Sequence, residues 1–138
     1  MEASAALSFE VHVDAPFEEA IERLTAALRD EKFGILTRID VHKTLKEKID
    51  KDFRQYAILG ACNPPLAHKA LEHEAQVGLM LPCNITVEAD PDGGSIIRVL
   101  DPDAMLQGFG LEDDPVLREV GAEARTRLRR VAESLEAS

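Results

Sequence analysis

The sequence predicts one globular domain that contains both helices and strands. The chain has 138 residues, 45% of them hydrophobic and 30% charged, which is enough apolar material for one core. Segments with period-two alternation are interleaved with segments whose apolar residues recur every three or four positions, and these are the periods of strands and helices. No repeat or low-complexity segment divides the chain, so we expect a single domain over residues 1–138 with its core at about 7–135.

The first part of the chain predicts two strands with a helix between them. Residues 9–13 alternate apolar with polar side chains, as in a half-buried strand. Asp14-Ala15-Pro16 then opens an amphipathic helix of about four turns, and Phe33-Gly34 ends it. A second strand is expected from Ile35 to Val41.

Residues 42–49 are expected to form a short, highly charged helical turn with only Leu45 and Ile49 facing inward. Two apolar anchors bury little area, so this segment should be mobile. It is either a lid over a site or a solvated connector, and we favour the connector because surface loops are the commoner case. A third strand should run from Phe53 into Cys62.

The second part of the chain predicts two helices and a hairpin. A helix begins at Pro64, and strands are expected over 79–89 and 95–100, joined by the turn Pro91-Asp92-Gly93-Gly94 and therefore antiparallel. Residues 101–110 read as an irregular loop. The final helix should start at Asp113-Asp114-Pro115 and continue for about six turns.

Composition and charge argue against several classes of function. The net charge of −10 repels polyanions, and with 4% aromatic residues and no Trp the chain has few platforms for stacking on bases. The arginines at 125–130 fall in the last turns of a helix, where cations complement the helix dipole. There is no basic N-terminal start and no long apolar segment, so we expect no nucleic acid, no membrane and a cytoplasmic protein with two free thiols.

Residues 59–71, with the similar stretch Leu81-Pro82-Cys83-Asn84 that carries a second Cys-Asn pair, form the best candidate site. An apolar run ends at Cys62, and Asn63 followed by two prolines is typical of a helix start. The thiol of Cys62 would then lie beside free N–H groups and the positive end of the helix dipole, which lowers a thiol pKa and favours anions. The alternative is that Cys62 is a small buried side chain at the end of a strand.

The chain resembles the domain of unknown function 302 family over most of residues 7–135. The matching sequence motifs are Phe33-Gly34, Thr44-Leu45-Lys46-Glu47-Lys48, residues 56–64, the helix through His68 and Ala70, and Leu81-Pro82-Cys83-Asn84. The resemblance implies a TATA-binding-protein-like α+β domain, in which a curved antiparallel five-stranded sheet carries long helices on one face in the order β-α-β-β-α-β-β-α. It also implies a homodimer, but it transfers no activity, and the fold name does not imply DNA binding.

Antiparallel pairing of the third and fourth strands would bring the two Cys-Asn pairs to one edge of the sheet. Our leading hypothesis is therefore a homodimeric module that binds a small ligand at a rim of Cys62, Asn63, Cys83 and Asn84 beside the helix start. Parallel pairing would instead separate the thiols by roughly 20 Å.

Two further classes of function stay open. A thiol-dependent enzyme or redox protein would use Cys62 as the nucleophile, Cys83 as the resolving thiol, and His68 or Asp101 for proton transfer. A purely structural domain would dock through a sheet edge or an apolar surface. Two thiols and His68 lack the usual metal-site spacing, so we expect no metal and no cofactor, and the sequence leaves open whether the protein is an enzyme at all.

Overall fold

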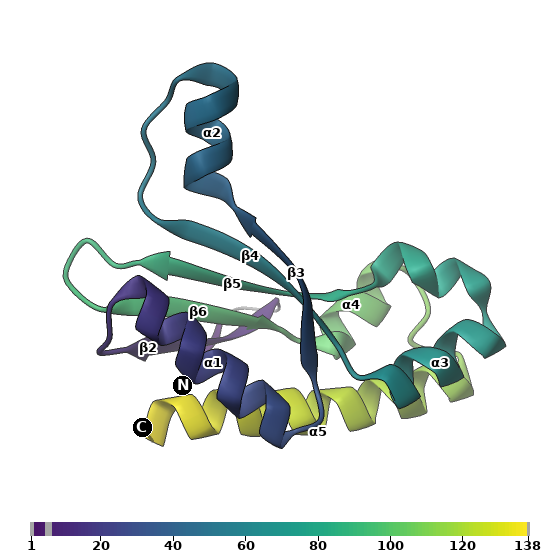
Figure 1. Cartoon of the computed structure of the whole chain (residues 1–138). Helices are drawn as coiled ribbons and strands as arrows, with labels where there is room; N and C mark the ends of the chain where they lie inside the picture. Colours follow the sequence, from purple (N-terminus) through teal and green to yellow (C-terminus); the bar gives the residue numbers. More distant parts are fainter. Residues whose placement is uncertain (1, 5–6, 138) are drawn as a thin grey trace.

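The computed structural model describes residues 2–4 and 7–137 of the chain (Figure 1). The elements in chain order are β1 (Glu2–Ser4), β2 (Ser8–Val13), α1 (Phe17–Asp30), β3 (Gly34–Asp40), α2 (Val41–Ile49), β4 (Tyr56–Cys62), α3 (Pro64–His73), the 3-10 helix η1 (Ala75–Met80), β5 (Cys83–Ala89), β6 (Ser95–Leu100), α4 (Pro102–Gly108) and α5 (Pro115–Ala137).

The strands form one antiparallel sheet in the order β1-β2-β6-β5-β4-β3. The predicted α+β fold with its five antiparallel strands is confirmed, and the three-residue β1 extends the sheet at one edge. The predicted hairpin joins β5 to β6, where Gly93 and Gly94 both have positive φ. A Cβ on Gly94 would lie 2.6 Å from the carbonyl oxygen of Val13, so the turn requires glycine there.

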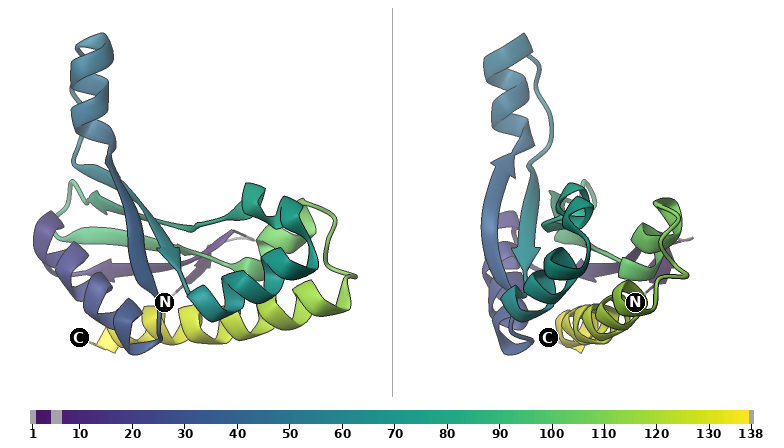
Figure 2. Two further views of the ribbon diagram at one scale, coloured as in Figure 1. Left: turned by 45° about the vertical axis from the view of Figure 1, so that its right-hand side comes forward. Right: turned by 90° about the vertical axis from the view of Figure 1, so that its right-hand side faces the viewer.

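Helices α1 and α5 cover one face of the sheet (Figures 1 and 2). Leu24 and Leu28 of α1 and Leu128 of α5 are fully buried against strand residues such as Leu59 and Ile85. Removing each of these side chains from water stabilises the fold by roughly 1.5–3 kcal/mol. In the described residues, the opposite face of the sheet carries no such layer of long helices, and we call it the open face.

Three sequence predictions about element bounds are wrong. Residues 101–110 are not a loop, because α4 occupies 102–108; the side chain of Asp101 caps it and Leu106 packs into a small apolar cluster. The strand predicted from Leu79 begins only at Cys83, because η1 precedes it. The third strand begins at Tyr56 rather than Phe53.

The charged segment after β3 is a helix, as predicted, but it packs less than predicted. None of the residues of α2 is buried, and Ile49, which was expected to face inward, is 59% exposed. Figures 1 and 2 show α2 standing away from the body of the protein. We call residues 41–54 the arm; its helix is held mainly by contacts at its base with β3 and β4.

A charge network lies on the open face of the sheet. The carboxylate of Glu88 on β5 is almost fully buried and accepts hydrogen bonds from Arg98 on β6 and from Arg54 of the arm. Arg98 also donates to Glu10 on β2. Burial by itself would raise the pKa of Glu88, but the hydrogen bonds from the two arginines outweigh it and hold that pKa below its usual value.

We expect Glu88→Gln to lower the free energy of unfolding at pH 7 by about 1–3 kcal/mol, because it removes the buried carboxylate that Arg54 and Arg98 share. Since the folded pKa of Glu88 is depressed, its contribution is present above the unfolded pKa of about 4.3 and is lost as pH falls through the folded value. Urea unfolding from pH 3 to pH 7 measures both effects. Glu10→Gln, which removes a single and more exposed contact, is the control and should cost less; an equal cost for both would contradict this assignment.

Candidate functional site

The two Cys-Asn pairs lie at the same end of the sheet. Strands β4 and β5 are antiparallel, with Ala61 opposite Cys83 and Gly60 opposite Asn84. Cys62 and Asn63 follow directly at the end of β4, and α3 begins at Pro64. The prediction that the two thiols lie at a shared edge, beside the start of a helix, is therefore confirmed.

The four side chains nevertheless do not form one rim. Side chains alternate along a strand, so Cys83 shares the helix-covered face with Ala61, whereas Asn84 lies on the open face. Cys83 is 8% exposed, Cys62 is half-buried and Asn84 is exposed. Cys62, Asn63 and Cys83 border one pocket, while Asn84 borders a separate hollow on the open face. The expectation of a common Cys/Asn rim is wrong on this point.

Asn63 has a structural role at the start of α3. Its side-chain oxygen accepts a hydrogen bond from the backbone N–H of Leu66 at 3.1 Å, and its side chain is buried. This is the N-cap that the sequence predicts. Because the cap uses a backbone N–H that an anion would have needed, it weakens the case for an anion site beside Cys62.

Burial raises the pKa of both thiols. The pKa of Cys62 lies above its ordinary value because the side chain is partly removed from water, which is opposite to the lowering predicted from the helix start. Burial, with a smaller contribution from nearby Cys62, raises the pKa of Cys83 to about 11. Both thiols are therefore protonated and weakly nucleophilic near neutral pH.

The side chains predicted to assist proton transfer at the thiols do not border the pocket. His68 is exposed on the outer side of α3, where its Nε2 lies 3.0 Å from a carboxylate oxygen of Glu72, and it does not border the pocket. Asp101 caps α4 and pairs with Arg125 of α5. Within residues 2–4 and 7–137, no group of three or more His, Cys, Asp or Glu side chains could hold a metal ion.

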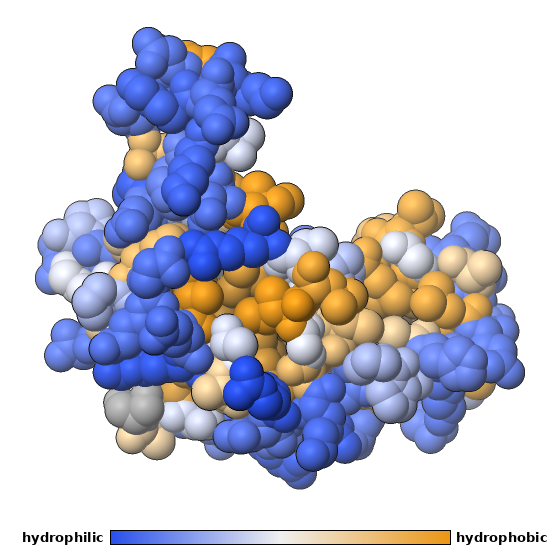
Figure 3. Space-filling view, in the orientation of Figure 1, coloured by the Kyte–Doolittle hydropathy of each residue, from blue (hydrophilic) through white to orange (hydrophobic). Residues whose placement is uncertain are grey.

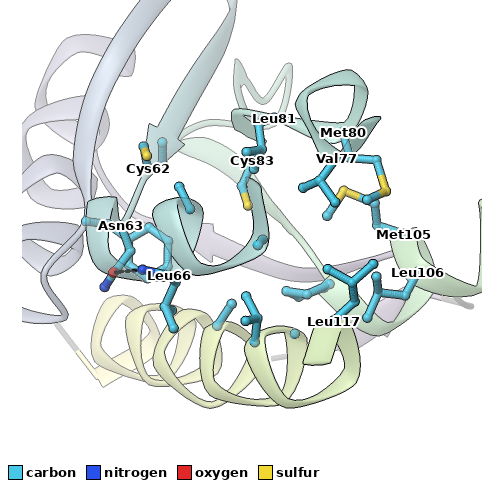
Figure 4. A pocket seen from close by; sticks show the side chains of 18 residues that line it. Cys62, Asn63, Leu66, Val77, Met80, Leu81, Cys83, Met105, Leu106 and Leu117 are labelled. Atoms are coloured by element: carbon cyan, nitrogen blue, oxygen red, sulfur yellow. Dashed lines mark hydrogen bonds between the residues drawn. The ribbon is translucent and has the colours of Figure 1, made fainter. Parts of the chain in front are cut away.

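A partly enclosed cavity of about 60 Å³ lies between the end of the sheet and helices α3, η1, α4 and α5 (Figure 4). It occupies the seam between the main core and the smaller apolar cluster formed by these helices. Its walls are almost entirely apolar, with Cys83 projecting from the sheet toward the helices. The residues that define it are Phe33, Ala61, Cys62, Asn63, Leu66, Ala67, Ala70, Val77, Met80, Leu81, Cys83, Pro102, Met105, Leu106, Leu117, Val120, Gly121 and Ala124.

The sequence singled out three of these residues as site residues, Cys62, Asn63 and Cys83, and the candidate stretch 59–71 contains four more, but the walls formed by η1, α4 and α5 were not predicted. Met105 and Leu106 fell in a presumed loop, and Gly121 and Ala124 were read simply as part of the final helix. The available signal was the Asp101-Pro102 start of α4, which resembles the Asp114-Pro115 start of α5. The chemistry of the walls favours an apolar group over an anion, because the few polar atoms are already bonded or protonated.

We expect both thiols to react with iodoacetamide more slowly than free cysteine at pH 7–8. The rate for each thiol, measured in the variant that replaces the other cysteine by serine, should rise with a midpoint above the ordinary thiol pKa, because burial raises the pKa of both. Mass spectrometry of the alkylated protein across pH gives both profiles. A Cys62 midpoint below that of free cysteine would restore the reactive-thiol hypothesis.

Asn63→Ala should lower the free energy of unfolding by about 1 kcal/mol through loss of the α3 cap, whereas Asn63→Ser should retain most of it because serine also caps. Thermal or urea unfolding of the two variants measures the difference. Equal losses in both variants would show that the cap is not what Asn63 contributes.

No helix in the described part of the chain is long and apolar enough to cross a membrane. No curated protein is significantly similar to the chain. Among solved structures, the chain is similar to the uncharacterized conserved protein DUF302 from Bacillus stearothermophilus, at 32% sequence identity and a TM-score of 0.82, over 94% of this chain and 98% of that one. The model of the domain of unknown function DUF302 matches residues 9–135. With its fold and its sequence in agreement, the chain belongs to the DUF302 family.

Proposed function

We propose that this protein is a homodimeric module that binds a small apolar ligand in the cavity beside Cys83. The observation that carries the proposal is the cavity itself. It lies where two apolar clusters meet without packing completely against each other. An unfilled apolar cavity forfeits packing energy, here on the order of 1 kcal/mol. A ligand that fills it recovers that energy.

The size and walls of the cavity define the ligand. Its volume of about 60 Å³ is far below the several hundred Å³ of pockets that hold drug-sized molecules. A short alkyl or acyl chain therefore fits best. The apolar end of a larger molecule also fits, with the rest of that molecule projecting out of the cavity into solvent. The raised thiol pKa values favour binding over thiol catalysis, so we assign no enzymatic activity.

A second copy of the chain and a cytoplasmic location complete the proposal. Several large apolar side chains are exposed, among them Leu36 at 66% and Leu79 at 80%, and exposed apolar surface of this kind is often covered by another chain. The two free cysteines suit a reducing compartment.

Gly121→Ala tests the ligand site, because a Cβ at Gly121 would lie 2.7 Å from the Cδ1 of Leu106. The tip of Leu106 must then move, and the free space beside it is the cavity. We expect xenon and butanol to shift the methyl resonances of Met80 and Met105 in the wild-type protein, and the variant to bind both probes about tenfold or more weakly.

Gly108→Ala is the matched control, because a Cβ there meets no atom and the glycine lies in α4 next to the same site. It should leave probe binding unchanged. Folding of both variants is checked by thermal unfolding, in which Gly121→Ala also gains up to about 1 kcal/mol of helix propensity. A wild-type protein that binds neither probe, or a Gly121→Ala variant that binds them equally well, would overturn the ligand site.

A further inference from the structure

The arm and the region around α4 carry opposite charges at opposite ends of the molecule. Residues 41–54 contain five Lys or Arg and three Asp or Glu, in a chain whose net charge is −10. Residues 101–114 contain five Asp or Glu and no Lys or Arg. Figures 1 and 2 show α2 projecting at one end of the sheet and α4 lying at the other, so the two segments are too far apart to meet within one chain.

Both segments also expose apolar side chains on or beside the open face. Ile49 of the arm is exposed, and Phe53 is partly so. Next to α4 lies a hollow of about 420 Å³, bordered among others by Leu7, Leu79, Pro82, Asn84, Leu100 and Phe109. Leu79 is 80% exposed and Phe109 more than half. Figure 3 shows the arm as largely hydrophilic and an apolar area running from its base toward the helices at the other end.

We propose that the open face of the sheet is the interface with a second copy of this chain, and that the arm of each copy contacts the 101–114 segment and the hollow of the other. This rests on the homodimer proposed above and specifies its interface. In a dimer with a two-fold axis the contact occurs twice, because each copy offers both an arm and a 101–114 segment to the other copy. The basic arm then meets the acidic segment, and Ile49 has an apolar hollow to enter.

The contact accounts for two features that a single chain leaves unexplained. Helix α2 buries none of its residues in its own chain, yet it carries the apolar residues Leu45 and Ile49 four positions apart on one side. Arg54, at the end of the arm, is tied to Glu88 near the end of β5 on the open face, which anchors the base of the arm to the proposed interface. Opposite charges also give such an interface its register and exclude arm-to-arm pairing.

Two charge-reversed variants test the contact. Lys48→Glu with Lys51→Glu changes the charge of the arm from +2 to −2, and Glu112→Lys with Asp113→Lys reverses the charge at residues 112 and 113 of the other segment; all four side chains are exposed. In each variant alone, both arm contacts of a dimer place like charges together, so the dimer dissociation constant at low salt should rise about tenfold or more. In an equimolar mixture, a heterodimer pairs opposite charges at both contacts, and dimerisation should return to near the wild-type level.

Sedimentation at several concentrations measures dimerisation in the two variants and in their mixture. The control is Arg29→Glu with Arg129→Glu, which reverses the same number of exposed charges on the helix layer. It should leave dimerisation unchanged. Recovery in the mixture cannot come from a folding defect, because neither variant is altered by mixing. Variants that dimerise as tightly as the wild type, or a mixture that does not recover, would overturn this interface and leave the homodimer standing. A wild-type protein that stays monomeric would overturn both the interface and the homodimer, but it would not affect the proposal that the cavity beside Cys83 binds an apolar ligand.

Discussion

The packing of α1 and α5 on a single face of the sheet is the constraint on which the rest of the structure depends. Packing of Leu24, Leu28 and Leu128 against the strands removes one face of the sheet from water. The other described face carries no layer of long helices. The open face is stabilised instead by ion pairs around Glu88. One-sided packing thus creates both the core and the exposed surface on which the proposed dimer depends.

The cavity is a second consequence of the same arrangement. Helix α5, of 23 residues, extends beyond the sheet, and its protruding part must be covered by α3, η1 and α4 instead of by strands. These short helices form their own apolar cluster around Val77, Leu106 and Leu117. The two clusters meet where β4 ends and β5 begins, and the seam between them is incompletely filled.

The thiols illustrate how two physical effects compete at one position. A helix start favours a thiolate, whereas removal from water favours the neutral thiol. At Cys62 and Cys83 burial prevails, because the surrounding walls are apolar and Asn63 already occupies an N–H group of α3. The side chains that draw most attention in the sequence therefore act as parts of an apolar wall and a helix cap.

The sequence by itself determined the order of the main helices and strands, because hydrophobic periodicity and capping residues are local signals, and family resemblance added the antiparallel pairing that brings Cys62 and Cys83 to one edge. Only the tertiary structure decided which face each side chain takes and how far each thiol is buried. The cavity combines residues from the sheet with Met105, Leu106 and Gly121, more than twenty positions further along the chain than Cys83. Such a site depends on long-range packing, which no local pattern encodes.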